Sequence, residues 1–126
     1  MCRTLIVEDN STFRQSLREV LNTHFPRMSI EEAINGKDAL QKVDTLTPDL
    51  IFMDIRLPDA NGLELAKQIG AVHQDIVLVV LTSYDLPEYR DAAYRSGASY
   101  FFTKGCTTRD ELVNAIEGIL STRHYD

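Results

Sequence analysis

The chain has 126 residues, of which 44% are hydrophobic and 25% are charged, and its formal net charge at pH 7 is −6. This composition is typical of one globular domain with a buried core, and a negative charge without a basic run does not favour nucleic-acid binding. No stretch of about 18 apolar residues is present, so the sequence predicts no membrane-spanning helix, and the apolar run near the N-terminus is too short for a signal peptide.

Five short runs rich in apolar and β-branched residues alternate with helical patterns along the chain. The strand-like runs are 4–7 (TLIV), 28–33 (MSIEEA), 50–53 (LIFM), 76–81 (IVLVVL) and 99–102 (SYFF). After each run, apolar residues recur with the spacing of a helix face, within 10–23 and 37–46 and then around 65–69, 89–93 and 112–120. This alternation predicts an α/β domain built around a parallel sheet.

The run at 28–33 differs from the others because apolar and polar residues alternate in it, which predicts a half-exposed strand at a sheet edge. Three of the other runs are continuously apolar, as in strands covered on both faces. Right-handed crossovers leave few strand orders, and the order 2-1-3-4-5 places the second strand outside the first. We therefore expect a doubly wound (βα)5 domain with helices on both faces of a five-stranded sheet, the order of flavodoxin-like folds.

Charged or hydroxyl-bearing side chains follow four of the five predicted strands. In doubly wound folds, ligands bind beyond the carboxyl ends of the strands. Because the first and third strands are neighbours in the expected order, Asp9 should lie near Asp54, and like charges about 4 Å apart repel by about 4 kcal/mol at an effective dielectric near 20. Such an oxygen-only pocket favours a hard divalent cation, Mg²⁺ before Zn²⁺. The residues after the four strands are Glu8 and Asp9, Asp54, Thr82 and Ser83, and Thr103, Lys104 and Gly105.

Each of these side chains also has an ordinary structural explanation. Glu8 with Asp9, or Thr82, could cap a helix, Asp54 could belong to a turn, and Lys104 could be a solvated lysine. These explanations do not account together for polar residues at four strand ends and none at the presumed edge strand. We therefore interpret the group as a site.

The same residues belong to an ordered set of motifs, namely VED (7–9), MDIRLPDANGLEL (53–65), LTSY (81–84) and GASYFFTKG (97–105). With this spacing, nearly the whole chain resembles the receiver domain of two-component response regulators. We accordingly expect residues 1–126 to form a single receiver domain, with the last few residues a tail or the start of a linker to an output domain.

The resemblance implies a phospho-acceptor and a Mg²⁺ site. Asp54 corresponds to the aspartate that accepts the phosphoryl group. Asp9 would bind Mg²⁺ directly and Glu8 through a water, with Asp54 and the backbone carbonyl of Arg56 as further ligands. A carboxylate can attack phosphorus to give an aspartyl phosphate, and the transfer then depends on positioning and on neutralising charge.

The resemblance also implies a switch. Lys104 would pair with the phosphoryl group, and Thr82 would bond one of its oxygens with help from the backbone N–H of Ser83. Phe101 is at the position of the aromatic switch residue, and we expect movement of residues 82–86 to let its ring turn inward. That movement would change the surface formed by the fourth helix, fifth strand and fifth helix.

Three residues depart from the family pattern. Gly105 replaces a common proline, which is similar to receivers that carry helix-turn-helix output domains of the nitrate-response type. Phe101 replaces a common tyrosine, and Ser83 replaces a more usual alanine. Arg56 and Tyr84 flank the acceptor and are expected to tune the attack of water on the phosphorylated form.

The resulting prediction is a cytoplasmic signalling switch that accepts phosphate from a sensor histidine kinase and serves as the receiver of a transcriptional regulator. Its surface of helix 4, strand 5 and helix 5 would engage a second copy or an output domain. We expect no enzymatic activity beyond its own phosphorylation and dephosphorylation. The alternatives are a stand-alone receiver, a receiver-like domain that acts without phosphate, and an aspartate-nucleophile phosphatase of the haloacid dehalogenase type. The phosphatase would need an acid two residues after the nucleophile, where Arg56 stands.

The two cysteines, Cys2 and Cys106, are expected to be free thiols. Cys2 precedes the first strand and Cys106 follows the fifth. They should therefore lie at opposite ends of a parallel sheet, about 17–20 Å apart along a strand, whereas a disulfide needs Cα atoms about 4.4–6.8 Å apart.

Overall fold

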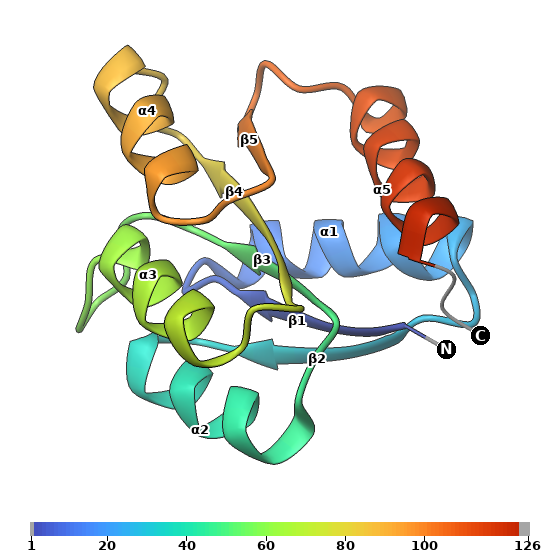
Figure 1. Cartoon of the computed structure of the whole chain (residues 1–126). Helices are drawn as coiled ribbons and strands as arrows, with labels where there is room; N and C mark the ends of the chain where they lie inside the picture. Colours follow the sequence, from blue (N-terminus) through green and yellow to red (C-terminus); the bar gives the residue numbers. More distant parts are fainter. Residues whose placement is uncertain (1, 124–126) are drawn as a thin grey trace.

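The computed structural model describes residues 2–123, and helices and strands alternate strictly along them (Figure 1). All the strands are parallel and form one sheet in the order β2-β1-β3-β4-β5, so the predicted topology is confirmed. His124 and the expected tail at 124–126 lie outside the described residues. The elements are β1 (Arg3–Val7), α1 (Ser11–His24), β2 (Ser29–Ala33), α2 (Gly36–Leu46), β3 (Leu50–Met53), α3 (Gly62–Val72), β4 (Val77–Thr82), α4 (Pro87–Arg95), β5 (Tyr100–Thr103) and α5 (Arg109–Arg123).

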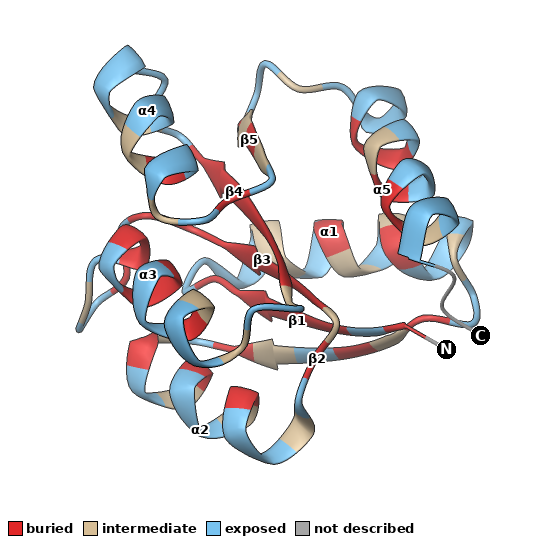
Figure 2. Ribbon diagram, in the orientation of Figure 1, coloured by how far each residue is buried: buried red, intermediate tan, exposed pale blue. Residues whose placement is uncertain are grey.

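Helices cover both faces of the sheet, and the buried residues concentrate between the layers (Figure 2). On one face, Leu21 of α1 and Ile116 of α5 pack against the sheet. On the other, Val43 of α2 and Ile69 of α3 do so, and α4 adds Ala93 to a third apolar cluster. Both strands covered in this way, β3 and β4, are wholly buried, and they are apolar throughout except for Thr82 at the end of β4.

The sheet edge at β2 has the half-exposed character that its alternating sequence predicts. Met28 and Ile30 are buried, whereas Glu31 is exposed. β2 pairs only with β1 among the described strands. The edge position therefore follows directly from the sequence pattern.

Two strands end one residue later than predicted, and this shift matters for the site. β4 runs to Thr82 and β5 to Thr103, and these two residues pair in register. Both are buried. The Thr82 backbone is consequently held by the sheet, so the residue does not belong to the loop that follows, and any response at this position starts from its side chain.

Asparagine side chains cap three of the helices that follow strands. Oδ1 of Asn10, Asn35 and Asn61 accepts hydrogen bonds from backbone N–H groups in the first turns of α1, α2 and α3, respectively. The cap of α1 is thus Asn10 and neither Glu8 nor Asp9. Thr82 caps no helix either, because α4 begins at Pro87 after Leu86, which makes no side-chain cap bond.

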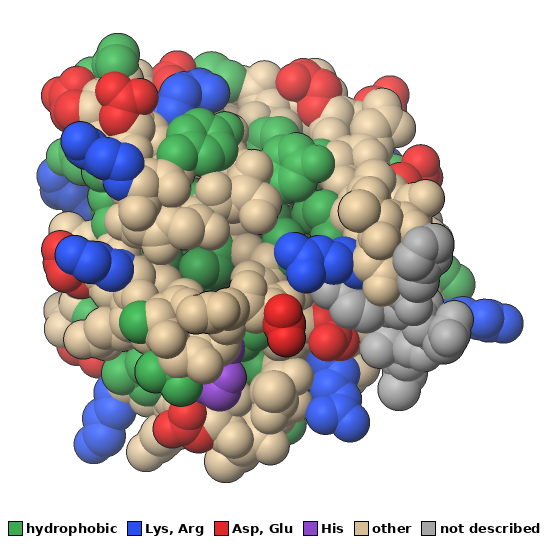
Figure 3. Space-filling view, in the orientation of Figure 1, with side chains coloured by type: hydrophobic (Ala, Val, Ile, Leu, Met, Phe, Trp, Pro, Cys, Tyr) green, Lys and Arg blue, Asp and Glu red, His purple; other side chains and the backbone are tan. Residues whose placement is uncertain are grey.

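The remaining features agree with the expectations from composition. Cys2 is buried and Cys106 exposed, and both are free thiols. None of the helices in residues 2–123 is long and apolar enough to cross a membrane. On the face shown in Figure 3, acidic and basic side chains are interspersed around the margin.

Candidate functional site

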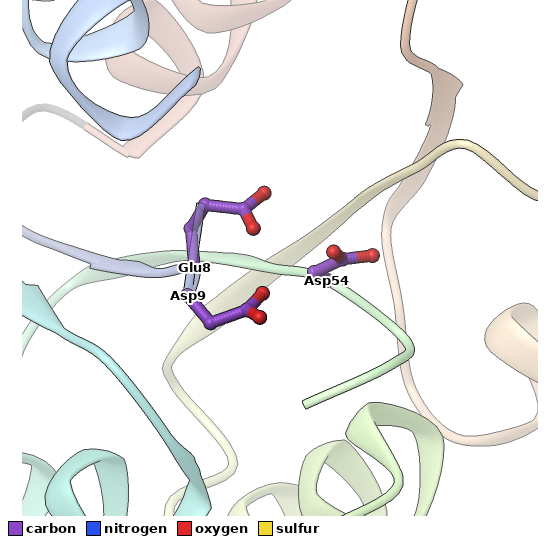
Figure 4. A group of neighbouring side chains, drawn as sticks. All are labelled: Glu8, Asp9 and Asp54. Carbon is purple, nitrogen blue, oxygen red and sulfur yellow. The ribbon is translucent and has the colours of Figure 1, made fainter. Parts of the chain in front are cut away.

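Three carboxylates meet at the carboxyl ends of β1 and β3 (Figure 4). Val7 pairs with Met53 across the two strands, so the residues that follow them emerge side by side. One oxygen each from Glu8, Asp9 and Asp54 lies within 4.8 Å of the other two. The carboxylates of Glu8 and Asp9 both extend toward the side on which Asp54 lies. A set of carboxylate oxygens at this spacing fits a hard divalent cation.

The ammonium group of Lys104 joins two of these carboxylates. Lys104 Nζ forms an ion pair with Glu8 Oε1 and lies 3.2 Å from Asp54 Oδ2, with a side chain only 14% exposed. It also lies 4.3 Å from the centre of the Phe13 ring. Burial alone would lower the pKa of Lys104, but the carboxylates of Glu8 and Asp54 outweigh burial and raise it, so the ammonium stays charged.

Glu8 is the most deeply buried acid of the site, at 3% exposed. Burial is the largest influence on its pKa and raises it, against the opposing effect of the hydrogen bonds from Lys104 and from the Asn10 N–H. Its position between β1 and Lys104 therefore depends on a cationic partner.

The Asp54 carboxylate has a fixed orientation at the end of β3. Oδ1 accepts a hydrogen bond of 2.7 Å from the Ile55 N–H, and Oδ2 accepts one from Lys104. The helix that follows begins against the same backbone. A Cβ on Gly62 would lie 1.9 Å from the Asp54 carbonyl oxygen. Only glycine permits this approach, which explains its place in the motif after Asp54.

The loop between β3 and α3 is tied to itself and to α2. Arg56 and Asn61 form an antiparallel bridge. The Asp59 carboxylate accepts hydrogen bonds of 2.7 Å and 3.0 Å from the backbone N–H groups of Gly36 and Lys37 at the start of α2. These bonds hold the pKa of Asp59 below its usual range, and the bond from the Gly36 N–H has the largest effect. Arg56, whose carbonyl was expected to face the metal, is thus held in a fixed loop.

Thr82 and Tyr84 come from the end of β4, which borders β3 on the side away from β1. Thr82 is fully buried, and its Oγ1 accepts a hydrogen bond of 3.3 Å from the Tyr84 N–H. The Arg56 guanidinium lies 4.2 Å from the centre of the Tyr84 ring. Arg56, two positions after Asp54, and Tyr84 therefore contact each other, while Ser83 is exposed.

The Phe101 ring already points inward. Phe101 is 4% exposed and packs with Val80 and Ala93. The Arg90 guanidinium lies 5.0 Å from the ring centre and 3.7 Å from Asp85. We expected movement of residues 82–86 to make room for this ring, but the small side chains of α4 leave that room in the present arrangement.

Sequence reasoning missed three residues that contact the site. Arg14 bonds the backbone of Glu8, Asp59 secures the acceptor loop, and Phe13 lies beside the Lys104 ammonium. Arg14 and Phe13 are in the first turn of α1, directly after the acidic pair, and that proximity is the one signal that the sequence offers. The contact between Asp59 and α2 joins residues 22 and 23 positions apart and leaves no local signal.

The fold and the site together define a receiver-type signalling domain, and the comparison with known families agrees. The model of the response regulator receiver domain matches residues 4–117, and this chain belongs to that family.

Curated relatives are transcriptional and response regulators. Transcriptional regulatory protein YdfI of Bacillus subtilis is 32% identical over 95% of this chain and 55% of that protein. Response regulator GacA of Pseudomonas viridiflava is 28% identical over 99% of this chain and 58% of that protein. The chain thus spans about half the length of the curated relatives it matches.

Solved structures lead to the same family. A two-component response regulator of the LuxR family from Aurantimonas sp. SI85-9A1 superposes with a TM-score of 0.87 at 28% identity, over 97% of this chain and 86% of that chain. The Mn(2+)-bound form of response regulator Rcp1 superposes with a TM-score of 0.79 at 25% identity, over 96% of this chain and 93% of that chain.

Proposed function

We propose that this domain is a phosphorylation-dependent switch that accepts a phosphoryl group on Asp54 from a sensor histidine kinase, with Mg²⁺ bound beside it. The observation that carries the proposal is the Asp54 carboxylate, which lies within 4.8 Å of two further carboxylates and 3.2 Å from the Lys104 ammonium. An acid needs this arrangement if it is to receive a dianionic group, because positive charge must be available on more than one side.

In the proposed transfer, an Asp54 oxygen forms a bond to phosphorus while the bond from phosphorus to the kinase histidine nitrogen breaks. The departing histidine nitrogen keeps the electron pair of the broken bond and takes a proton from water, so the histidine leaves as neutral imidazole and the product is an aspartyl phosphate. Lys104 neutralises charge on the phosphoryl oxygens, since its two carboxylate partners outweigh burial and keep it protonated. The Thr82 hydroxyl accepts from Tyr84 and keeps its own hydrogen for a phosphoryl oxygen.

Asp9, Asp54 and the Arg56 carbonyl would hold the cation directly, and Glu8 through water. When bound, Mg²⁺ neutralises charge on the oxygens around phosphorus. The all-oxygen donor set favours Mg²⁺ over softer metals, and the related Rcp1 has a Mn(2+)-bound form.

The output of the switch would pass through α4, β5 and α5. Phosphorylation adds roughly −1.5 to −2 charges, and Thr82 and Lys104 would shift toward them. Val80 and Thr82 both belong to β4, and Phe101 of β5 packs against Val80. A shift at Thr82 would therefore reach the inward ring. A second copy of the chain or an output domain would recognise the altered surface.

The family and the relatives favour a wider role in transcription. In a whole protein resembling YdfI or GacA, this domain would act in the cytoplasm as the receiver of a transcriptional regulator and would not itself contact nucleic acid. A stand-alone receiver acting through protein–protein contacts is the alternative. A phosphatase of the haloacid dehalogenase type is disfavoured by Arg56, which occupies the position of the second acid.

The test is labelling with acetyl phosphate and Mg²⁺, followed by intact mass. The wild type should gain one acid-labile phosphoryl group, and Asp54→Asn should gain none, because the acceptor is lost while the shape is kept. Asp59→Asn is the matched control, since it removes a carboxylate from the same loop and should still be labelled. Chelation of Mg²⁺ should abolish labelling of the wild type. Substantial labelling of Asp54→Asn would overturn the assignment.

A further inference from the structure

Arg14 of α1 connects the acidic group to the edge strand of the sheet. Its Nη1–H donates a hydrogen bond of 2.8 Å to the backbone carbonyl oxygen of Glu8, and its Nε forms an ion pair with Glu32 of β2. The Arg14 side chain is only 17% exposed. An arginine at the surface of a helix would ordinarily be solvated, so this partly buried double contact calls for a specific explanation.

The carbonyl that Arg14 holds belongs to the peptide group between Glu8 and Asp9. A peptide group is planar, so fixing its oxygen fixes the direction in which the chain leaves β1 and carries Asp9. The Asp9 carboxylate is exposed, and it makes none of the side-chain hydrogen bonds found among residues 2–123. Its place beside Asp54 is therefore set by the backbone that Arg14 restrains.

Glu32 makes this arrangement compatible with a bound cation. Its second carboxylate oxygen lies 2.6 Å from Arg18 Nη1, one helical turn beyond Arg14. Burial alone would raise the pKa of Glu32, but its bonds to Arg14 and Arg18 outweigh burial and lower it. The ionised carboxylate compensates the Arg14 charge, so the guanidinium orients the site without strongly repelling a divalent ion.

We propose that Arg14 is a positioning residue for the metal site: by bonding the Glu8 carbonyl while paired with Glu32, it holds Asp9 at the distance from Asp54 that a divalent cation requires. This inference rests on the proposed function, because it assumes that a divalent cation binds at Glu8, Asp9 and Asp54. Arg14 itself contacts neither the cation nor the phosphoryl group.

Arg14→Gln tests the role, with Arg18→Gln as the matched control. Both changes remove a guanidinium from α1 that pairs with Glu32. Of these two arginines, Arg14 bonds the Glu8 carbonyl and Arg18 does not. Mn²⁺ binding, followed by electron paramagnetic resonance of the free ion, should weaken about tenfold in Arg14→Gln, the typical effect of losing a group that orients a metal ligand. Arg18→Gln should change the affinity by less than about twofold, as for a surface ion pair.

A second measurement separates positioning from general destabilisation. In acetyl phosphate labelling, Arg14→Gln should raise the Mg²⁺ concentration for half-maximal rate about tenfold while the rate at saturating Mg²⁺ stays near that of the wild type. Arg14→Lys keeps the charge opposite Glu32 but lacks the forked donor, so it should show the same raised Mg²⁺ requirement at a melting temperature near that of the wild type.

The outcomes distinguish the two proposals. Equal Mn²⁺ affinity in Arg14→Gln and Arg18→Gln would overturn the role of Arg14 while leaving the metal site standing. A loss of labelling rate that persists at saturating Mg²⁺ would also overturn it. Absence of Mn²⁺ binding in the wild type would overturn the metal site and this inference with it.

Discussion

The loops that follow β3 and β4 flank the same site, yet they are held very differently. The β3–α3 loop has an internal bridge, a carboxylate bonded to two N–H groups of α2 and an asparagine cap on its helix. In the β4–α4 loop, the Tyr84 N–H bonds Thr82 Oγ1 and Asp85 lies 3.7 Å from Arg90, and its helix begins without a side-chain cap. Leu86, at the cap position, is 47% exposed.

The difference in restraint between the two loops matches the different tasks that we propose for them. The loop after Asp54 must keep the acceptor and the Arg56 carbonyl in place, and its restraints accordingly lie within the loop and run to α2 and to the start of α3. The loop after Thr82 must be able to respond to a new charge, and a weakly restrained segment moves at small free-energy cost. The restraint of each loop can be changed separately by mutation.

Among these changes, Gly62→Ala is expected to lower the free energy of unfolding most. The new Cβ would lie 1.9 Å from the Asp54 carbonyl oxygen, so the backbone of the acceptor loop must shift. Overpacking typically costs about 1–3 kcal/mol and occasionally more, and we expect the upper end because the contact is with backbone. The free energy of unfolding in urea measures this loss.

Gly118→Ala in α5 is the matched control, since nothing lies within 4 Å of its added Cβ. It should stabilise the domain by about 0.5–1 kcal/mol, the usual gain from replacing glycine in a helix. Equal stability of Gly62→Ala and the wild type would show that the acceptor loop is more adaptable than its contacts indicate.

Changes at the N-terminal cap positions of α3 and α4 are expected to have an intermediate effect on the free energy of unfolding. Asn61→Ala removes a cap that bonds the Leu63 N–H at 2.8 Å and should cost about 1 kcal/mol of unfolding free energy. Leu86→Ser should instead be more stable than Leu86→Ala by about 1 kcal/mol, because residue 86 is extended and followed by Pro87 at the start of α4.

Thermal and urea unfolding of these three variants measures both cap energies. If Leu86→Ser and Leu86→Ala were equally stable, the start of α4 would already be satisfied and the contrast between the loops would be weaker. Added stability in Leu86→Ser should also reduce the change at α4 on phosphorylation, which amide chemical shifts would report.

The smallest effect on stability is expected from Asp59→Ala, and this effect should depend on pH. The folded state holds the pKa of Asp59 below its usual value near 3.9. The carboxylate therefore stabilises the fold above that value, and its contribution is lost as the pH falls through the lower, folded pKa. Urea midpoints of the wild type and Asp59→Ala should differ at pH 7 and converge on acidification.

Asp85→Ala is the control for Asp59→Ala in the other loop. Asp85 is exposed and pairs only with the exposed Arg90 at 3.7 Å among the described residues, so its removal should leave the urea midpoint unchanged. A difference between wild type and Asp59→Ala that persisted at low pH would mean that the loop is held by packing and not by the carboxylate.

The fold and most of the candidate site residues could be predicted because the polar site residues come just after apolar strand runs in the sequence. Glu8 and Asp54 follow an apolar run directly and Lys104 follows one after Thr103, and parallel strands bring such residues to one rim. The interaction between Lys104 and Asp54 spans 50 positions. Strand order predicts that both residues lie at the same rim, whereas the role of Lys104 at the acceptor came from the resemblance to receiver domains.

The restraints on the site were not predictable in the same way. Asp59 looks like an ordinary turn residue in the sequence, and its bond to α2 arises only when two loops meet. Arg14 looks like a solvated helix residue until β2 brings Glu32 beneath it. The inward position of Phe101 depends on the volume left by Ala93, which no periodic pattern reveals.

The two cysteines make the molecule easy to label. Cys2 is buried, whereas Cys106 is exposed two positions after Lys104. A thiol-reactive fluorophore used in limiting amount would attach to Cys106 in the native protein. It would then report in real time on the segment that begins at Lys104, in a protein whose sequence contains no tryptophan to serve as an intrinsic probe.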